Sequence, residues 1–171
     1  SRKELRREFI DGFRRGKPCS DCGKSFATFC MEFDHLKDKV SSVSTMMRTS
    51  VPLDKIAAEI AKCDLVCVNC HRVRTKRRCN ALPFRADRVY WLLAEYKSKP
   101  CMDCGYCFPF ESMDFDHRDP SQKEFMLSSV KHLKLEGRRG EVEAEIAKCD
   151  VVCANCHRVR SSKMFGFDKY A

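Results

Sequence analysis

Eight cysteines form Cys-x-x-Cys doublets that recur between the two halves of the chain, a spacing that could bind metal. Each half of the 171-residue chain has an early and a late doublet, and a histidine directly follows each late one. Four thiolates around one ion suit tetrahedral zinc, and they leave no open position for chemistry, so we expect two structural sites. The alternative, buried free thiols or disulfides, fits the doublet spacing less well. The expected ligands are Cys19, Cys22, Cys67 and Cys70 in the first half, and Cys101, Cys104, Cys153 and Cys156 in the second.

A second set of residues could perform acid–base and metal chemistry. Each half contains a Phe-Asp-His sequence in addition to the histidine after the late doublet. An aspartate oxygen and an imidazole nitrogen can hold a divalent metal, and another imidazole can take up a proton near neutral pH. A lone histidine at a strand end is more often structural, but this set occurs twice and could hydrolyse a phosphodiester. Its members are Asp34, His35 and His71, and then Asp116, His117 and His157.

The chain is a tandem repeat. The stretch 59–74 recurs at 145–160, an offset of 86, whereas Lys17-Pro-Cys19 recurs at Lys99-Pro-Cys101, an offset of 82. We expect the four extra residues of the second copy to lie within 131–143. The repeat predicts two units, residues 1–82 and 83–171. Units this small bury little apolar surface and often need a metal staple.

The elements that must position these residues are mixed, which predicts an α+β fold. Residues 2–15 predict a basic amphipathic helix, 27–35 a strand, and 52–63 a further helix. Leu65-Val66 predicts a short strand that leads into a basic helix over 72–78. The polar stretch 36–51 is expected to be a loop, which could hold phosphates or simply lie solvated. Alternation along a regular strand sends Asp34 and His35 to opposite faces, so both can approach one phosphate only if the strand ends or bulges there.

The charge of the chain favours a polyanionic partner. The formal net charge is +9, and residues 1–82 carry most of the excess. Nucleic acid is the simplest such partner. The sequence shows no signal-peptide pattern and no apolar run of membrane-spanning length, and its cysteines are read as reduced. We therefore expect a reducing intracellular compartment, either cytoplasm or nucleus, and no membrane association.

Basic side chains follow both late doublets. A run of charge is more often a solvated face than a binding site, but beside a candidate phosphodiesterase centre we expect contact with phosphates. The candidate phosphate contacts are Arg72, Arg74, Lys76 and Arg77 in the first copy, and Arg158 and Arg160 in the second.

Phe33-Asp-His35 with Cys67-Val-Asn-Cys-His71, and Phe115-Asp-His117 with Cys153-Ala-Asn-Cys-His157, resemble a known family. The chain resembles the HNH nucleases, also called the ββα-metal or His-Me finger family, in their zinc-stapled branch. Together with the early doublets, whose tight turns we call knuckles, the resemblance covers most of both repeats. It implies two tandem ββα-metal units, each with a structural four-cysteine zinc site and flanking helices.

The resemblance also implies roles for the second set of residues. Asp34 with His71, and Asp116 with His157, would each hold one Mg²⁺ or another divalent cation. His35 and His117 would activate water, and hydrolysis would leave 5′-phosphate and 3′-hydroxyl ends.

One position departs from the family pattern. The family's middle asparagine commonly lies nine residues before the last histidine, where this chain has Lys62 and Lys148. Lysine donates hydrogen bonds but cannot accept them. Asn69 and Asn155 are possible substitutes that steady the loop, or they are helix-start residues with local hydrogen bonds.

These features together predict a site-specific, metal-dependent endonuclease of double-stranded DNA, of homing or restriction type. One centre in each repeat would allow both strands to be cut by a monomer with internal pseudo-twofold symmetry, or by a homodimer. The alternatives are a nicking enzyme with one active repeat, and a zinc-stabilised DNA-binding module without catalysis.

Overall fold

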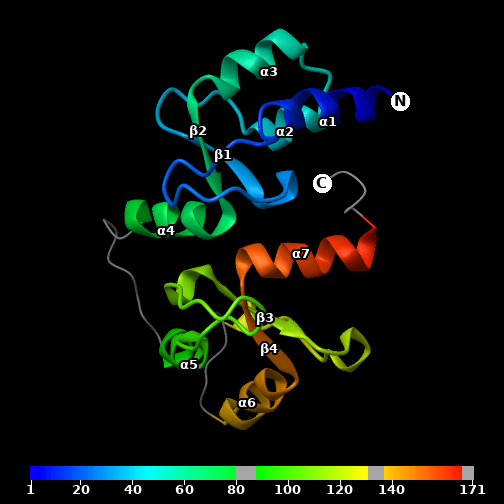
Figure 1. Ribbon diagram of the computed structural model, residues 1–171. Helices are drawn as coiled ribbons and strands as arrows, with labels where there is room; N and C mark the ends of the chain where they lie inside the picture. The colour runs from blue at the N-terminus through cyan, green and yellow to red at the C-terminus, as the bar shows by residue number, and fades with distance from the viewer. Residues whose placement is uncertain (80–87, 131–136, 167–171) are drawn as a thin grey trace. The chain divides into compact units, whose positions relative to one another are not determined.

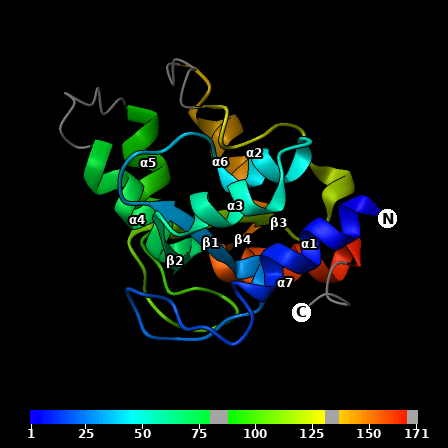
Figure 2. The same cartoon turned by 90° about the horizontal axis from the view of Figure 1, so that it is seen from above.

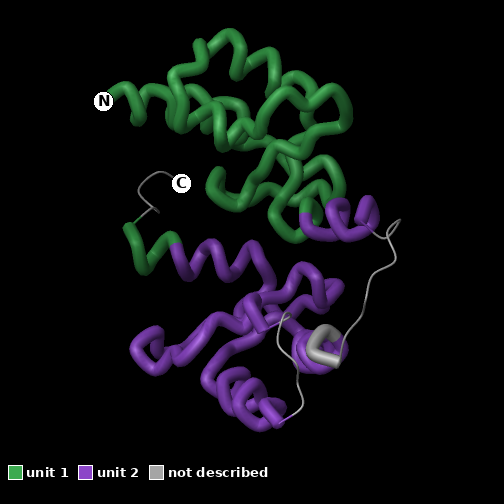
Figure 3. Tube along the Cα trace, turned by 180° about the vertical axis from the view of Figure 1, so that it is seen from behind, with its two compact units in different colours: residues 1–71, 162–171 green, residues 72–161 purple. Residues whose placement is uncertain are grey.

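The computed structural model describes residues 1–79, 88–130 and 137–166 (Figure 1). They form two compact units, residues 1–71 with 162–166 and the described residues between 72 and 161, coloured separately in Figure 3. The repeat boundary predicted at 82/83 lies outside the described residues. No helix among the described residues is long and apolar enough to cross a membrane.

The first copy of the repeat combines helices with one two-stranded sheet. Both views show α1, α2 and α3 side by side (Figures 1 and 2). The 36–51 stretch, predicted to be a loop, instead contains a helix, because Ser42 caps α2 and Val43 and Met46 bury its apolar side. The elements are α1 (Arg2–Gly12), a 3₁₀ turn (Thr28–Cys30), β1 (Met31–His35), α2 (Val43–Arg48), α3 (Leu53–Ile60), β2 (Cys63–Cys67) and α4 (Val68–Cys79).

The sheet of the first copy is an antiparallel pair with an uninterrupted register. Met31 lies opposite Cys67, Asp34 opposite Asp64, and His35 opposite Cys63. Residues directly opposite share a face, and successive residues alternate between faces. One face therefore carries Glu32, Asp34, Asp64 and Val66, and the other carries Phe33, His35, Cys63 and Leu65.

The second copy repeats this plan. β3 pairs with β4 in the same register, with Met113 opposite Cys153 and His117 opposite Cys149. Its elements are α5 (Arg88–Lys97), 3₁₀ turns (Phe110–Ser112 and Pro120–Gln122), β3 (Met113–His117), α6 (Arg139–Ala147), β4 (Cys149–Cys153) and α7 (Ala154–Phe165). The predicted mixture of helices and small antiparallel sheets is thus confirmed as α+β.

Each copy has two small apolar clusters. One cluster packs helices against the sheet, around Ile10, Ile56 and Ile60 in the first copy and around Leu92, Val142 and Ile146 in the second. The other surrounds the first cysteine of the knuckle, with Met31 and Val66 or with Met113 and Val152. Cores of this size contribute little to the free energy of unfolding, so a bound metal could contribute substantially to stability.

We predict that Ile56→Ala lowers the free energy of unfolding by about 2–5 kcal/mol, because deleting a fully buried side chain leaves a cavity. Ile56 is 0% exposed, whereas Leu53 in the same helix is 39% exposed and provides the matched control. Urea unfolding of the zinc-loaded chain measures both. Equal losses for Ile56→Ala and Leu53→Ala would contradict this account of the core.

Candidate metal centres

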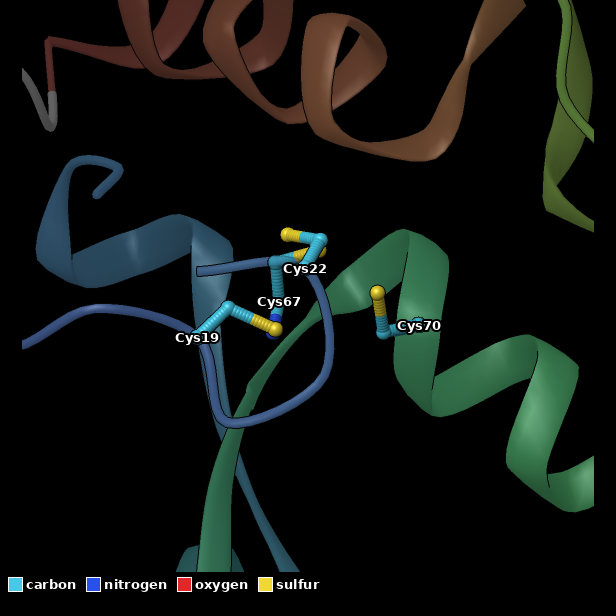
Figure 4. Close-up of side chains that lie close together, drawn as sticks. All are labelled: Cys19, Cys22, Cys67 and Cys70. Atoms are coloured by element: carbon cyan, nitrogen blue, oxygen red, sulfur yellow. The ribbon is translucent and has the colours of Figure 1, made fainter. Parts of the chain in front are cut away.

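Two clusters of four cysteines are the most complete candidate metal sites. Within each cluster the four sulfur atoms lie within 4.8 Å of one another. Figure 4 shows Cys19 and Cys22 on the knuckle loop, with Cys67 at the end of β2 and Cys70 on α4. Sulfurs about 2.3 Å from a tetrahedral zinc lie roughly 3.8 Å apart, so the spacing is compatible with zinc. The eight predicted ligands are thus brought together as two groups that could hold structural zinc.

The knuckle backbone already favours thiolate at its first cysteine. Gly23 ends the tight turn with φ +69°, and the Cys67 N–H donates to Cys19 Sγ at 3.2 Å. Burial by itself raises the pKa of the Cys19 thiol, but N–H donors from Cys22, Cys67 and Asp21 lower it to about 7. Burial and the neighbouring Cys67 raise the pKa of Cys70. A divalent cation would offset that effect by stabilising all four thiolates.

Two of the remaining cysteines belong to the apolar clusters. Cys63 packs against the first helical cluster, and Cys149 is part of the second. Burial raises the pKa of each thiol to about 11, which keeps both protonated. Both thiols therefore take part in apolar packing.

The histidine that follows each late doublet lies between two carboxylates of one strand face. His71 Nδ1 pairs with Glu32, and its Nε2 lies 3.3 Å from Asp34 Oδ1. His157 Nδ1 lies 2.9 Å from Asp114 Oδ2, and its Nε2 lies 3.5 Å from Asp116 Oδ1. The two copies therefore share one geometry.

This geometry fits the ligand pairs expected for a divalent cation. Two ligand atoms about 2.1 Å from one cation and at right angles lie roughly 3 Å apart, close to the observed Asp34–His71 separation. A metal-binding histidine normally donates its other N–H to a carboxylate. Glu32 and Asp114 are placed to accept that bond. The sequence analysis missed both, although their alternation with Asp34 and Asp116 signals a common face.

Arg160, an expected phosphate contact, already pairs with three carboxylates. Its guanidinium lies 3.0 Å from Asp116, 2.9 Å from Asp150 and 2.8 Å from Asp103. The hydrogen bond to Asp103 is the foremost cause of the raised pKa of Arg160. A phosphate would therefore compete with these carboxylates for Arg160, and a cation at Asp116 would compete with Arg160 for that carboxylate.

The other expected phosphate contacts differ in their surroundings. Within the second compact unit, Arg72 pairs with Asp114 at 2.7 Å. Burial alone would raise the pKa of Asp114, but hydrogen bonds from His157 and Arg72 place it far below its usual range. Arg77 is exposed on α4, whereas the remaining three are half-buried, namely Arg74, Lys76 and Arg158.

The two expected catalytic histidines lie on the other face of their strands. His35 Nε2 lies 3.0 Å from Glu59 Oε1, and His117 Nε2 lies 2.7 Å from Glu145 Oε1. Both imidazoles are only 10% exposed. β1 runs without a bulge as far as His35, so the structure does not bring His35 to the face that carries Asp34 and His71.

Glu59 collects several donors besides the histidine. It accepts from the N–H groups of Val40 and Ser41, at 2.8 and 3.3 Å, and from Lys62 Nζ at 2.7 Å. The lysine is the foremost cause that lowers the pKa of Glu59 to about 2, with burial opposing it. The carboxylate is therefore charged at any ordinary pH.

Glu145 repeats this arrangement. It accepts from the N–H groups of Glu124 and Phe125, at 3.0 and 3.4 Å, and from Lys148 Nζ at 2.8 Å. Burial by itself would raise the pKa of Glu145, but these donors and His117 lower it to about 2. Neither glutamate was predicted from the sequence. In both copies the repeated stretch nevertheless contains a glutamate followed three residues later by a lysine, a pattern that could have indicated them.

Lys62 and Lys148 hold loop backbone through their ammonium groups. Lys62 Nζ donates to the Asp38 carbonyl at 3.1 Å, and Lys148 Nζ donates to the Gln122 carbonyl at 3.2 Å. Each lysine thus joins its glutamate to the loop after the strand, using donors alone. Asn69 and Asn155 are buried in the first turns of α4 and α7, between the cysteines of the late doublets.

The glutamates also locate the extra residues of the second copy. His35 precedes Val40 by five residues, whereas His117 precedes Glu124 by seven. Glu59 follows Val40 by 19 residues, and Glu145 follows Glu124 by 21. Two extra residues therefore lie before Glu124 and two after it. The prediction that all four fall within 131–143 is wrong, because the loop absorbs half of them.

No family model, curated protein or solved structure matches this chain.

We predict that the reduced chain binds two equivalents of zinc, and that Cys22→Ser lowers the number to one. A missing thiolate leaves three ligands, which weakens tetrahedral binding. Cobalt substitution read by its thiolate charge-transfer absorption gives the stoichiometry. Cys107→Ser, which changes an exposed cysteine outside the clusters, should keep two equivalents. Unchanged binding by Cys22→Ser would contradict the assignment.

We predict that Glu145→Gln lowers the melting temperature near neutral pH and that this loss shrinks as pH falls below about 4.5. The pKa of Glu145 falls from 4.5 to about 2 on folding, so its stabilisation is present above pH 4.5 and disappears as pH approaches 2. Calorimetry compares Glu145→Gln with the unmodified chain at each pH. Any loss of zinc in acid then affects both proteins and does not change the difference between them. The exposed Glu141→Gln serves as control, and a pH-independent difference would contradict the prediction.

Proposed function

We propose that this chain is a metal-dependent endonuclease that hydrolyses phosphodiester bonds of double-stranded DNA, with one centre in each copy of the repeat. The observation that carries the proposal is the pairing of Asp34 with His71 Nε2, 3.3 Å apart, while Glu32 occupies His71 Nδ1. Its recurrence at His157 supports a centre in each copy.

In the proposed centres, Asp34 and His71, or Asp116 and His157, would hold the cation. A bound divalent cation would supply positive charge to the phosphate and to the leaving 3′ oxygen. Glu32 and Asp114 would accept a hydrogen bond from Nδ1–H of each histidine, which keeps Nε2 turned toward the cation.

His35 and His117 are the proposed proton acceptors. The ionised glutamates occupy Nε2 of both rings, which leaves Nδ1 as the nitrogen that can take a proton from water. Each histidine is the last residue of its strand, so a phosphate at the strand end could approach from that side.

The proposed substrate follows from charge. The excess of Lys and Arg is concentrated in residues 1–82, and α4 ends in Lys76, Arg77 and Arg78. Cationic side chains beside a phosphodiesterase centre suit a DNA backbone. Site-specific cutting of both strands, as in homing or restriction enzymes, is proposed from the two centres.

A second candidate function is a zinc-stabilised DNA-binding module without catalysis. The observation in its favour is the burial of His35 and His117 against carboxylates, which also suits structural histidines. Under this alternative the four-cysteine clusters would stabilise the fold, and the basic helices would supply all of the contacts with DNA.

We predict that the zinc-loaded chain converts supercoiled plasmid to nicked and linear forms in Mg²⁺ or Mn²⁺. Glu32→Gln combined with Asp114→Asn should lower the rate by roughly 10–100-fold, as expected for partners of metal-binding histidines. Asp34→Asn combined with Asp116→Asn should lower it further, whereas the exposed Asp54→Asn should have no effect.

The same assay separates the alternatives. If both centres work, His35→Ala and His117→Ala should each retain nicking and lose linearisation. Normal cutting of both strands by His35→Ala would show that the first centre is not catalytic. An absence of nicking by the unmodified chain in every metal would leave the binding module.

A further inference from the structure

The buried glutamates determine which nitrogen of the opposing histidine carries hydrogen. An ionised carboxylate has only acceptor oxygens, so the 3.0 Å contact between Glu59 Oε1 and His35 Nε2 requires Nε2 to donate. The same reasoning applies to the 2.7 Å contact between Glu145 and His117. In a neutral ring, Nδ1 is then the nitrogen that has a free lone pair.

We propose that Glu59 and Glu145 are positioning residues that hold His35 and His117 in the Nε2–H tautomer. Nδ1 is thereby kept as the atom that takes up a proton. The consequence for cleavage rests on the proposed nuclease function, but the tautomer is a property of the folded chain and can be measured without activity.

The same carboxylate also fixes the loop that follows the strand. Glu59 accepts from the N–H groups of Val40 and Ser41, while Lys62 joins it to the Asp38 carbonyl. Asp38 has φ +48°, a left-handed conformation that such anchoring helps to hold. The imidazole and the loop backbone are therefore attached to one charged group.

A general need for stability does not explain this choice of residue. Burying a carboxylate is costly, and apolar residues of similar volume often stabilise as well or better. Anchoring the loop requires the carboxylate with the lysine and the backbone donors, but it does not require a bond to the imidazole. Both copies nevertheless direct one carboxylate oxygen at the imidazole, although the loops differ in sequence and by two residues in length. The bond to the histidine is thus retained in both copies together with the loop anchor.

The deciding experiment is nitrogen-15 NMR of the histidine rings in the full zinc-loaded chain, under mildly alkaline conditions that favour neutral imidazole. His35→Gln and His117→Gln assign the signals. In the unmodified chain we expect both rings to show the Nε2–H pattern, with an Nε2 proton protected from exchange. An Nδ1–H pattern or an even mixture in either ring would overturn the inference for that copy, and this measurement requires no variant of the glutamates.

Two pairs of variants separate positioning from loop anchoring. Glu59→Gln and Glu145→Gln should release the tautomer and lower kcat by roughly 10–100-fold, with DNA affinity unchanged. Lys62→Met and Lys148→Met remove a loop anchor but keep the histidine bond, so they should preserve the Nε2–H pattern. An unchanged pattern in the glutamate variants, or its loss in the lysine variants, would overturn the proposal. If the unmodified chain does not cut DNA, the nuclease proposal fails while the NMR result still stands.

Discussion

The two-residue period of a β-strand governs the chemistry of both repeats. Each sheet has only two strands, and both of its faces carry polar or charged side chains. The register places the aspartate and the helix histidine on one face and the strand histidine on the other. A shift of one residue would exchange these partners and would also turn Phe33 and Phe115 away from the helices that they pack against. Apolar packing and polar chemistry thus depend on the same register.

The charged groups on each face follow a common principle. The imidazoles of His35, His71, His117 and His157 each have a carboxylate partner, and the deeply buried Glu59 and Glu145 each accept from several donors. Glu59 and Glu145 are tolerated in the interior because two backbone N–H groups, a lysine and a histidine surround them. On the opposite face, the side chains of Glu32 and Asp114 are more exposed than those of Glu59 and Glu145.

The sequence was sufficient for features that spacing alone determines. Duplicated doublets identified the eight clustered cysteines, and spacing along the first copy identified α1, α3, α4 and the strands of its sheet. The partners of the histidines were missed because they depend on register, which relates Glu32 to His71 only after β1 has been paired with β2. Helix α2 was missed because Ser and Thr dominate its stretch, and its two buried side chains, Val43 and Met46, are too few to produce a clear period. Lys62 could be identified as a departure from a family pattern, but its bond to the Asp38 carbonyl depends on the fold of the loop.

The late doublet spans the junction between a strand and a helix, with Cys67 ending β2, Cys70 in the first turn of α4 and His71 next in the chain. Any ion that binds these two thiolates also sets the angle at which the helix leaves the strand. The direction of the adjacent imidazole is therefore thermodynamically linked to occupancy of the cysteine cluster. A metal bound by these thiolates would therefore help to orient His71 without contacting it.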